Sequence, residues 1–348
     1  MQFTEIKQNY YPSVMLWLIL LTIMVFLIII IGGLTRLTDS GLSMVDWQPL
    51  LGTIPPLNYS QWTEVFEKYK LTPEFIYVNK NMELEEFKFI FWWEWFHRFF
   101  ARLIGIVFIF PFIYFFIKKY LNIFFYKKFS ILFGLGLIQG FVGWWMVKSG
   151  LVNDPYVSQY RLTFHLINAV IIYCLLLWAC IEYYYFKSMR FISSFKNNEF
   201  LIFLSIIFVF ITILSGGFMA GSHAGQSFNT YPLMNGKIIP DDIYLANLGI
   251  FNAFENVVTI NFNHRWFGTI TFIYTFSLFS YLIFNKFIKL SIKIIVLVLV
   301  VLTFQFLLGI MALISNVAIE YGSLHQTNSI VLLTVLFIAY FQSKLSRT

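Results

Sequence analysis

The feature that most constrains this 348-residue chain is a series of eight apolar runs, each close to the length of a membrane-spanning helix. Such a helix needs about 20 predominantly apolar residues. Charged residues make up only 12% of the chain, against about 25% in a soluble globular protein. The composition excludes a water-soluble enzyme, a disordered protein and a secreted disulfide scaffold, and it predicts an all-α polytopic membrane protein. The predicted spans are residues 13–31, 95–117, 129–147, 162–181, 200–220, 264–285, 294–314 and 323–343.

Charges in the connecting segments predict the orientation of these spans. Lys and Arg are enriched on the cytoplasmic side of helical membrane proteins. Residues 118–128, between the second and third spans, contain four lysines and no acidic residue. We therefore expect both termini in the cytoplasm and the long loops 32–90 and 221–260 outside. No Arg-rich, acid-poor presequence precedes the first span, which favours a bacterial inner membrane. The net charge of +7 is not gathered into a basic, aromatic-lined patch, so no nucleic-acid partner is expected.

A pattern of polar residues and glycines recurs along the chain with a period near 165 residues. Such a repeat predicts two pseudo-symmetric four-helix bundles in the same orientation, covering residues 1–185 and 186–348. A four-helix bundle can hold cofactor ligands on facing helices. The repeated positions are His97 and His264, Arg98 and Arg265, Gln139 and Gln305, His165 and His325, and the glycine pairs 32–33 and 216–217.

Four of the five histidines lie near the outer end of an even-numbered span. Ionisable residues inside spans are rare and usually functional, and recurrence in both halves argues against a simple hydrogen bond between helices. Two imidazoles per bundle suit a haem iron, whereas zinc needs three or four converging ligands. The predicted metal-ligand pairs are His97 with His165, and His264 with His325. His223 lies in an outer loop and is expected to be solvated.

Arginines accompany the first histidine of each predicted pair. Arg98 and Arg265 directly follow a histidine, and Arg102 lies one helical turn further in. A guanidinium pairs well with a carboxylate, so these residues are candidates for the haem propionates. Contact with lipid headgroups remains an alternative for Arg98 and Arg265. Two further alternatives stay open: the glycine pairs allow close helix approach or end a helix, and the glutamines bond across helices or face the porphyrin.

Glu94 distinguishes the first half of the chain from the second. It shares a helix face with His97 and Arg98, whereas the second half has Asn261 at the corresponding position. A carboxylate beside a cofactor can act as a general acid or base. A simple ion pair with Arg98 is the alternative. The difference predicts one site where the chemical reaction takes place and one site that transfers electrons.

Long stretches of the chain resemble haem A synthases, most closely the type shared by alphaproteobacteria and mitochondria. The resemblance covers roughly residues 12–342. Its most specific parts are GGLTRLTDSGLSMVDWQPLLGTIPP from Gly32 and EFKFIFWWEWFHRFFARLIG ending at Gly105. The sequence departs from some bacterial members because residues 32–90 contain no cysteine, and it has His223 where an arginine is expected.

The resemblance implies an oxidoreductase that converts the C8 methyl of haem O into the formyl group of haem A. It implies successive hydroxylations to a gem-diol that loses water. His97 and His165, with Arg98 and Arg102, would hold the substrate haem, and Glu94 would take part in the chemistry.

In the second half, the resemblance implies that His264 and His325, with Arg265, hold a haem b cofactor. Haem A would then serve cytochrome c oxidase of the aa3 type. Implied partners are the farnesyltransferase that makes haem O and cytochrome c oxidase assembly factors, and a homo-oligomer is left open.

Two other classes compete with this interpretation. A bis-histidine membrane cytochrome b acting only in electron transfer would favour haems at both depths of the bilayer, whereas these histidines share one predicted depth. A transporter would place its site near the midplane on broken helices. The spans lack such breaks, apart from Pro111.

Overall fold

The computed structural model describes residues 8–46, 51–152, 154–185, 197–285 and 290–344. Within them, regular structure is helical apart from an isolated bridge between Met234 and Lys237. Eight helices are long and apolar enough to cross a membrane, so the chain is a multi-pass membrane protein and the prediction of an all-α fold with eight spans is confirmed. The chain divides into two compact units, Met1–Ser188 and Met189–Thr348. The predicted boundary at residue 186 lies outside the described residues.

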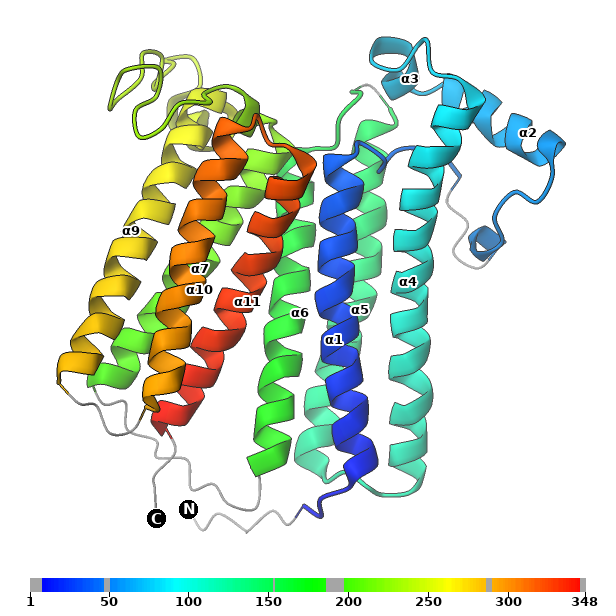
Figure 1. Ribbon diagram of the computed structural model, residues 1–348. Coiled ribbons are helices and arrows are strands. Elements are labelled where there is room, and N and C mark those ends of the chain that lie inside the picture. The colour runs from blue at the N-terminus through cyan, green and yellow to red at the C-terminus, as the bar shows by residue number, and fades with distance from the viewer. Residues whose placement is uncertain (1–7, 47–50, 153, 186–196, 286–289, 345–348) are drawn as a thin grey trace. The chain divides into compact units, whose positions relative to one another are not determined.

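Four long helices form the first unit, and two short helices and a 3-10 turn lie in its outer loop (Figure 1). Helices α4 and α6 each pack against both α1 and α5, so α4 and α6 occupy opposite corners of a four-helix bundle. The elements are α1 (Pro12–Leu37), η1 (Leu51–Thr53), α2 (Tyr59–Lys70), α3 (Pro73–Tyr77), α4 (Leu84–Ile117), α5 (Ile123–Gly150) and α6 (Gln159–Tyr185).

Pro111 lies inside α4 without ending it. A proline has no backbone N–H, so the carbonyl four residues earlier loses its helical partner. That carbonyl belongs to Val107, and it accepts a 2.8 Å hydrogen bond from the indole Nε1 of Trp17 on α1. The buried Trp17 ring also packs edge-on against Phe108. A neighbouring helix thus satisfies the group that proline frees, and α4 continues to Ile117.

Helix α4 begins at Leu84, eleven residues before the predicted start of the second span, because its first turns belong to the outer loop. There Phe87 and Phe91 pack against Trp62, Phe66 and other residues of α2. The side chain of Asn58 accepts a hydrogen bond from the backbone of Gln61 and so caps α2. This cluster anchors the outer loop on the beginning of α4, and Figure 1 shows α2 and α3 next to that end of the helix.

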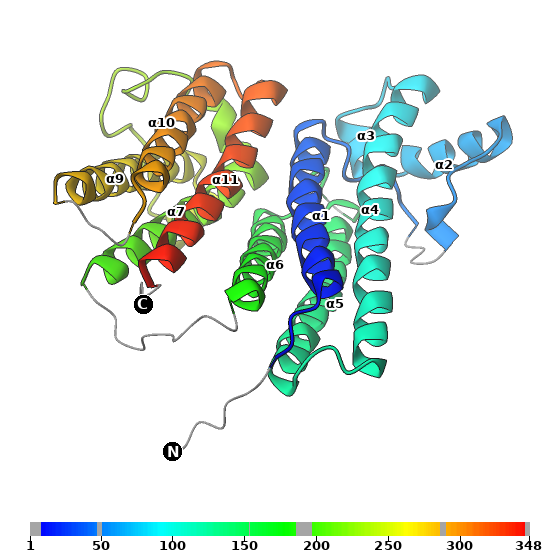
Figure 2. The ribbon, with the colours of Figure 1, turned by 60° about the horizontal axis from the view of Figure 1, so that its bottom comes forward.

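The second unit has the same order of packing around its own four long helices (Figure 2). Helices α9 and α11 each pack against both α7 and α10, so they occupy opposite corners, as α4 and α6 do in the first unit. The elements are α7 (Asn197–Gly221), η2 (Ala224–Gln226), η3 (Gly249–Phe251), α8 (Asn252–Glu255), α9 (Val257–Phe284), α10 (Ile292–Ile314) and α11 (Ile319–Lys344).

Candidate functional site

The structure brings the rings of His264 and His325 next to each other within the second unit. The first lies on α9 and the second on α11, which are diagonal corners of the bundle. Their ring centroids are 6.3 Å apart and their planes are nearly perpendicular, at 86°. A metal held between two imidazoles, with metal–nitrogen bonds of about 2.0 Å each, would separate the ring centroids by roughly 6 Å. The spacing therefore fits one metal ion shared by both rings.

Hydrogen bonds orient both rings of this second pair. Ser215 on α7 lies 2.9 Å from Nδ1 of His264, and its hydroxyl donates to the carbonyl of Thr212. The amide of Gln305 on α10 lies 3.2 Å from Nδ1 of His325. In His264 this leaves Nε2 for a ligand, which is the usual arrangement of a metal-binding imidazole with its other nitrogen held by the protein. In His325 the amide N–H of Gln305 donates to Nδ1, so this contact orients the ring from the acceptor side.

The first pair, His97 on α4 and His165 on α6, occupies the corresponding diagonal of the first unit. Gly32 on α1 lies against the ring of His97, and Gly143 on α5 lies against the ring of His165. The Gln139 amide on α5 is 3.4 Å from Nε2 of His165, and its oxygen accepts a 2.7 Å hydrogen bond from Asn168. Nδ1 of His165 is buried without a hydrogen-bond partner among the described residues. The ring of His97 likewise makes no hydrogen bond to any residue that the structure describes.

Each histidine ring lies against a glycine of a helix on the other diagonal. A methyl group added to any of these glycines would come within 2.9–3.3 Å of the ring. The absence of a side chain therefore makes room for the imidazole. The facing pairs are Gly32 with His97, Gly143 with His165, Gly216 with His264, and Gly309 with His325.

These contacts exclude helix termination by the glycine pairs and show what the glutamines contact. Helix α1 continues past Gly32 to Leu37, and α7 continues past Gly216 to Gly221, so helix termination is wrong. The glycines allow close approach of the histidine rings instead. The glutamines bond across helices, and they do so to the histidines themselves.

The donor set and its geometry fit a haem rather than a structural zinc. Within the described residues, no group of three or more His, Cys, Asp and Glu side chains is placed to hold a metal ion. Two imidazoles on facing helices are the axial ligands that a six-coordinate haem iron uses. All four histidines are partly accessible, and the buried Nδ1 of His165 has no hydrogen-bond partner among the described residues. The residues present therefore fit an iron porphyrin in each unit.

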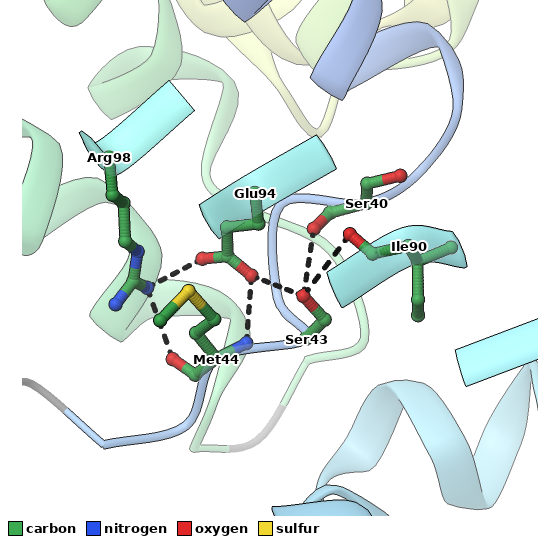
Figure 3. Close-up of polar contacts among 6 residues, drawn as sticks. All are labelled: Ser40, Ser43, Met44, Ile90, Glu94 and Arg98. Atoms are coloured by element: carbon green, nitrogen blue, oxygen red, sulfur yellow. Dashed lines mark hydrogen bonds and ion pairs between the residues drawn. The ribbon is translucent and has the colours of Figure 1, made fainter. Parts of the chain in front are cut away.

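Glu94 is the centre of a buried hydrogen-bond network at the mouth of the first unit (Figure 3). Its Oε2 accepts hydrogen bonds from the Ser43 hydroxyl at 2.6 Å and the Met44 backbone N–H at 2.8 Å. Its Oε1 pairs with Arg98 at 2.5 Å. These donors offset the cost of burying a carboxylate that is almost completely covered. They also tie the start of the outer loop to α4.

The second unit closes its own loop in the same way, without a charge at this position. Asn261 donates a 2.7 Å hydrogen bond to the carbonyl of Ala224, and Arg265 bonds to Asn261 Oδ1. Arg265 also donates to the carbonyls of Phe228 and Thr230. Residues 94 and 261 are therefore both loop clamps. The carboxylate is the property that only the first clamp has.

The ion pair with Arg98, which the sequence left as an alternative for Glu94, is present in the structure. Arg102 lies one turn deeper in α4 and is partly buried. His223 lies in the outer loop, in a left-handed backbone conformation directly before η2, and is only partly exposed. Both cysteines, Cys174 and Cys180, are free.

Sequence reasoning missed the residues that support the site from other helices and loops. Ser43 and Met44 lie about 50 positions from Glu94 in a loop without periodicity. Ser215 is one residue before a glycine that the repeat did identify. The only signal available for Ser215 was that a serine in an apolar helix usually has a hydrogen-bond role.

The fold and these residues define a class: multi-pass helical membrane proteins with paired intramembrane histidines on facing helices. A sequence model of the COX15-CtaA family, described as cytochrome oxidase assembly protein, matches residues 15–337. The chain therefore belongs to the COX15-CtaA family, which confirms the resemblance noted from its motifs.

Relatives agree over most of the chain. A heme A synthase of Nitrosomonas eutropha is 40% identical over 333 residues, covering 94% of this chain and 92% of that protein. A heme A synthase of Nitrosospira multiformis is 46% identical over 267 residues, covering 76% and 74%. Heme A synthase COX15 of Arabidopsis thaliana is 40% identical over 338 residues, covering 93% and 73%.

Proposed function

We propose that this chain is a haem A synthase, an oxidoreductase that oxidises the C8 methyl of haem O to a formyl group. The observation that carries the proposal is that the two similar histidine pairs have different polar residues beside them. Only the first has a buried carboxylate, Glu94, at its mouth, whereas the second has the neutral Asn261. The family membership and the names of the relatives support the same activity.

In this proposal the two units hold different haems. His97 and His165 bind the substrate haem O, and their facing glycines leave room for both rings. His264 and His325 bind a resident haem b, whose iron supplies one-electron transfer when bound. The 6.3 Å separation of the second pair supports this assignment.

Glu94 is the proposed proton acceptor of the first site. Oxidation of a methyl group releases protons, and a positioned carboxylate can take one in the transition state. Ser43 and Met44 hold Oε2, while Arg98 holds Oε1, so the carboxylate has one orientation. Met44 also accepts from Arg98 through its carbonyl, which couples the loop to the base.

The arginines are proposed to bind the haem propionates in addition to their protein partners. Arg98 and Arg102 lie on one face of α4 in the first unit, and Arg265 has the place of Arg98 in the second. A guanidinium has five N–H donors, so one arginine can contact both the loop and a propionate. Replacement of Arg265 should lower haem affinity in the second unit, whereas contact of Arg265 with lipid headgroups alone would leave that affinity unchanged.

The proposed setting is a bacterial inner membrane, with both termini in the cytoplasm and the haem sites near the periplasmic side. The lysines of residues 118–128 support this orientation. A reporter fused to the C-terminus tests it and should read cytoplasmic. The proposed partners are the farnesyltransferase that supplies haem O and assembly factors of cytochrome c oxidase.

The decisive experiment is pigment extraction after co-expression with an enzyme that makes haem O. The intact chain should convert haem O to haem A, which mass spectrometry of the extracted pigment distinguishes by the formyl group. A chain that binds haem and leaves haem O unchanged would instead be an electron-transfer cytochrome b. A preparation that contains flavin or zinc, or no pigment, would also contradict the proposal.

A further inference from the structure

One difference between the two histidine pairs concerns the residue before the first facing glycine. In the second unit, Ser215 precedes Gly216 and contacts Nδ1 of His264. In the first unit, Ile31 precedes Gly32, which faces His97. The repeat places Ile31 at the register position of Ser215, and the rings there are turned differently: a Cβ at Gly32 would lie nearest Nε2 of His97, at 3.3 Å, and one at Gly216 nearest Cε1 of His264, at 3.2 Å. A hydroxyl in one unit is replaced by an alkyl group in the other.

The hydrogen bonds of Ser215 determine which nitrogen of His264 can bind a metal. A serine hydroxyl has one proton, and Ser215 donates it to the Thr212 carbonyl at 2.8 Å. Its oxygen therefore accepts from Nδ1–H of His264, at 2.9 Å, and leaves the lone pair of Nε2 for iron. Such a bond fixes the ring and makes its other nitrogen a stronger ligand. Ile31 can do neither for His97.

The neighbouring positions extend the same difference. In the second unit, the hydroxyls of Thr212 and Thr271 lie 2.9 Å apart, next to Ser215, and both are buried or partly buried. The repeat places Ile28 and Ile104 at the two corresponding positions of the first unit. A small polar cluster therefore supports His264, whereas the surroundings of His97 on α1 are apolar.

From this we infer that Ser215 makes the second histidine pair a site of permanent haem retention, and that Ile31 leaves the first pair able to release its haem. The inference deepens the proposed function and rests on it, because an enzyme whose substrate and product are haems needs one exchangeable site and one retained cofactor. Ser215 is a positioning residue here, since it acts on the haem through His264.

The first test replaces Ser215 in the purified full-length chain loaded with haem b. Ser215→Ala should speed transfer of haem to excess apomyoglobin by about 10–100-fold, the usual effect of removing such a supporting bond. It should also raise the midpoint potential of the low-spin haem, because a less basic imidazole stabilises the ferric state less. Both properties are followed by optical absorbance and need no enzymatic turnover.

Two matched variants separate ligand positioning from helix packing. Ser215→Thr keeps the hydroxyl and should restore the slow transfer. Ser205→Ala removes another fully buried serine from the same helix, away from the histidines, and should leave both rate and potential unchanged. Equal haem loss from Ser215→Ala and Ser205→Ala would overturn the inference, and so would failure of the threonine variant to restore retention.

The reciprocal test gives the first site the missing hydroxyl. Ile31→Thr keeps the branched shape of isoleucine at Cβ, so the variant should fold, and it should slow haem release from the first pair by at least about 10-fold. Ile31→Val is the control without a hydroxyl and should release haem as the unmodified chain does. Unchanged release from Ile31→Thr would overturn the inference.

These measurements distinguish the inference from the proposed function. If the chain makes haem A but Ser215→Ala retains haem as well as the unmodified chain does, the proposed function stands and the inference about Ser215 is wrong. If the chain makes no haem A but Ser215→Ala changes haem transfer as predicted, Ser215 still positions the ligand. The enzyme assignment, and with it the exchangeable first site, is then wrong.

Discussion

The two four-helix units are built alike around their histidines and differ in the groups next to them. In both, the histidines come from one diagonal pair of helices and the facing glycines from the other. The first unit has Glu94 and Arg102 where the second has Asn261 and Thr269. The packing around the histidine rings is therefore the same in both units, whereas the polar residues at these neighbouring positions differ.

The loop clamps separate a structural role from a chemical one. Glu94 and Asn261 both tie the loop after the first helix of their unit to a later helix, and each works with an arginine four residues on. An uncharged amide is sufficient for that task. A buried carboxylate is costly to desolvate, and Asn261 closes the second loop without one. This comparison supports the proposed role of the Glu94 charge in the chemistry of the first site.

The largest expected effect is that of removing this charge. Glu94→Gln keeps an oxygen for Ser43 and Met44 but cannot accept a proton, so haem A production should fall by at least about 100-fold. Haem b bound to the second unit should keep its spectrum. Ser43→Ala is the control, because it removes one donor and keeps the carboxylate, and it should cost no more than about 10-fold. Full haem A production by Glu94→Gln would remove Glu94 from the chemistry.

The next effect tests the likeness of the two units. A methyl group at Gly309 would lie 2.9 Å from His325, and one at Gly143 would lie 3.0 Å from His165. Overpacking of this kind costs about 1–3 kcal/mol, so Gly309→Ala and Gly143→Ala should both lower the thermal stability in detergent and disturb haem absorbance. Gly32→Ala meets His97 at a looser 3.3 Å and should be milder. Equal effects of all three changes would contradict the close glycine–histidine contacts as the cause.

The smallest expected effect concerns the outer loops. Burial raises the pKa of Glu74 to about 8, and the charges of Glu94 and Asp39 add to the shift while Arg36 opposes it. Tyr69 donates a 2.9 Å hydrogen bond to this carboxyl. The folded loop favours the protonated form of Glu74. The contribution of this carboxyl to the stability of the folded loop is therefore complete below the unfolded pKa, about 4.5, and is lost as the pH rises through about 8.

Hydrogen exchange, corrected for the intrinsic effect of pH, measures this change. Protection of α2 and α3 should fall between pH 5 and pH 8.5, and Glu74→Gln should abolish the fall. The second outer loop is the internal control, because its acidic residues Asp241, Asp242 and Glu255 are exposed. Its protection should not follow the same pH dependence. A parallel fall in both loops would contradict the role of Glu74.

Much of this arrangement could be predicted from sequence, because it follows from periodic or repeated patterns. The length of the apolar runs identified the eight spans, and the offset between His97 and His264 indicated equivalent positions. The spacing of Glu94 and Arg98 on one helix face predicted their contact, since residues four apart are neighbours.

The remaining features depend on contacts between distant segments, for which single positions carry little signal. The loop residues Ser43 and Met44 reach Glu94 only after folding. The extension of α4 beyond the predicted span follows from packing of Phe87 against α2, which hydropathy alone does not predict. The contact between each glycine and its histidine depends on how far the two helices are shifted along their axes relative to each other. The periodicity of the sequence does not determine this shift.

The central claim is that the two histidine pairs hold different haems, and pigment analysis of paired variants tests it most directly. One chain replaces His97 and His165 with alanine, the other replaces His264 and His325, and each is co-expressed with a source of haem O. The first should retain haem b and contain neither haem O nor haem A. The second should lose haem b and still bind haem O. Loss of the same pigments from both variants would contradict the account.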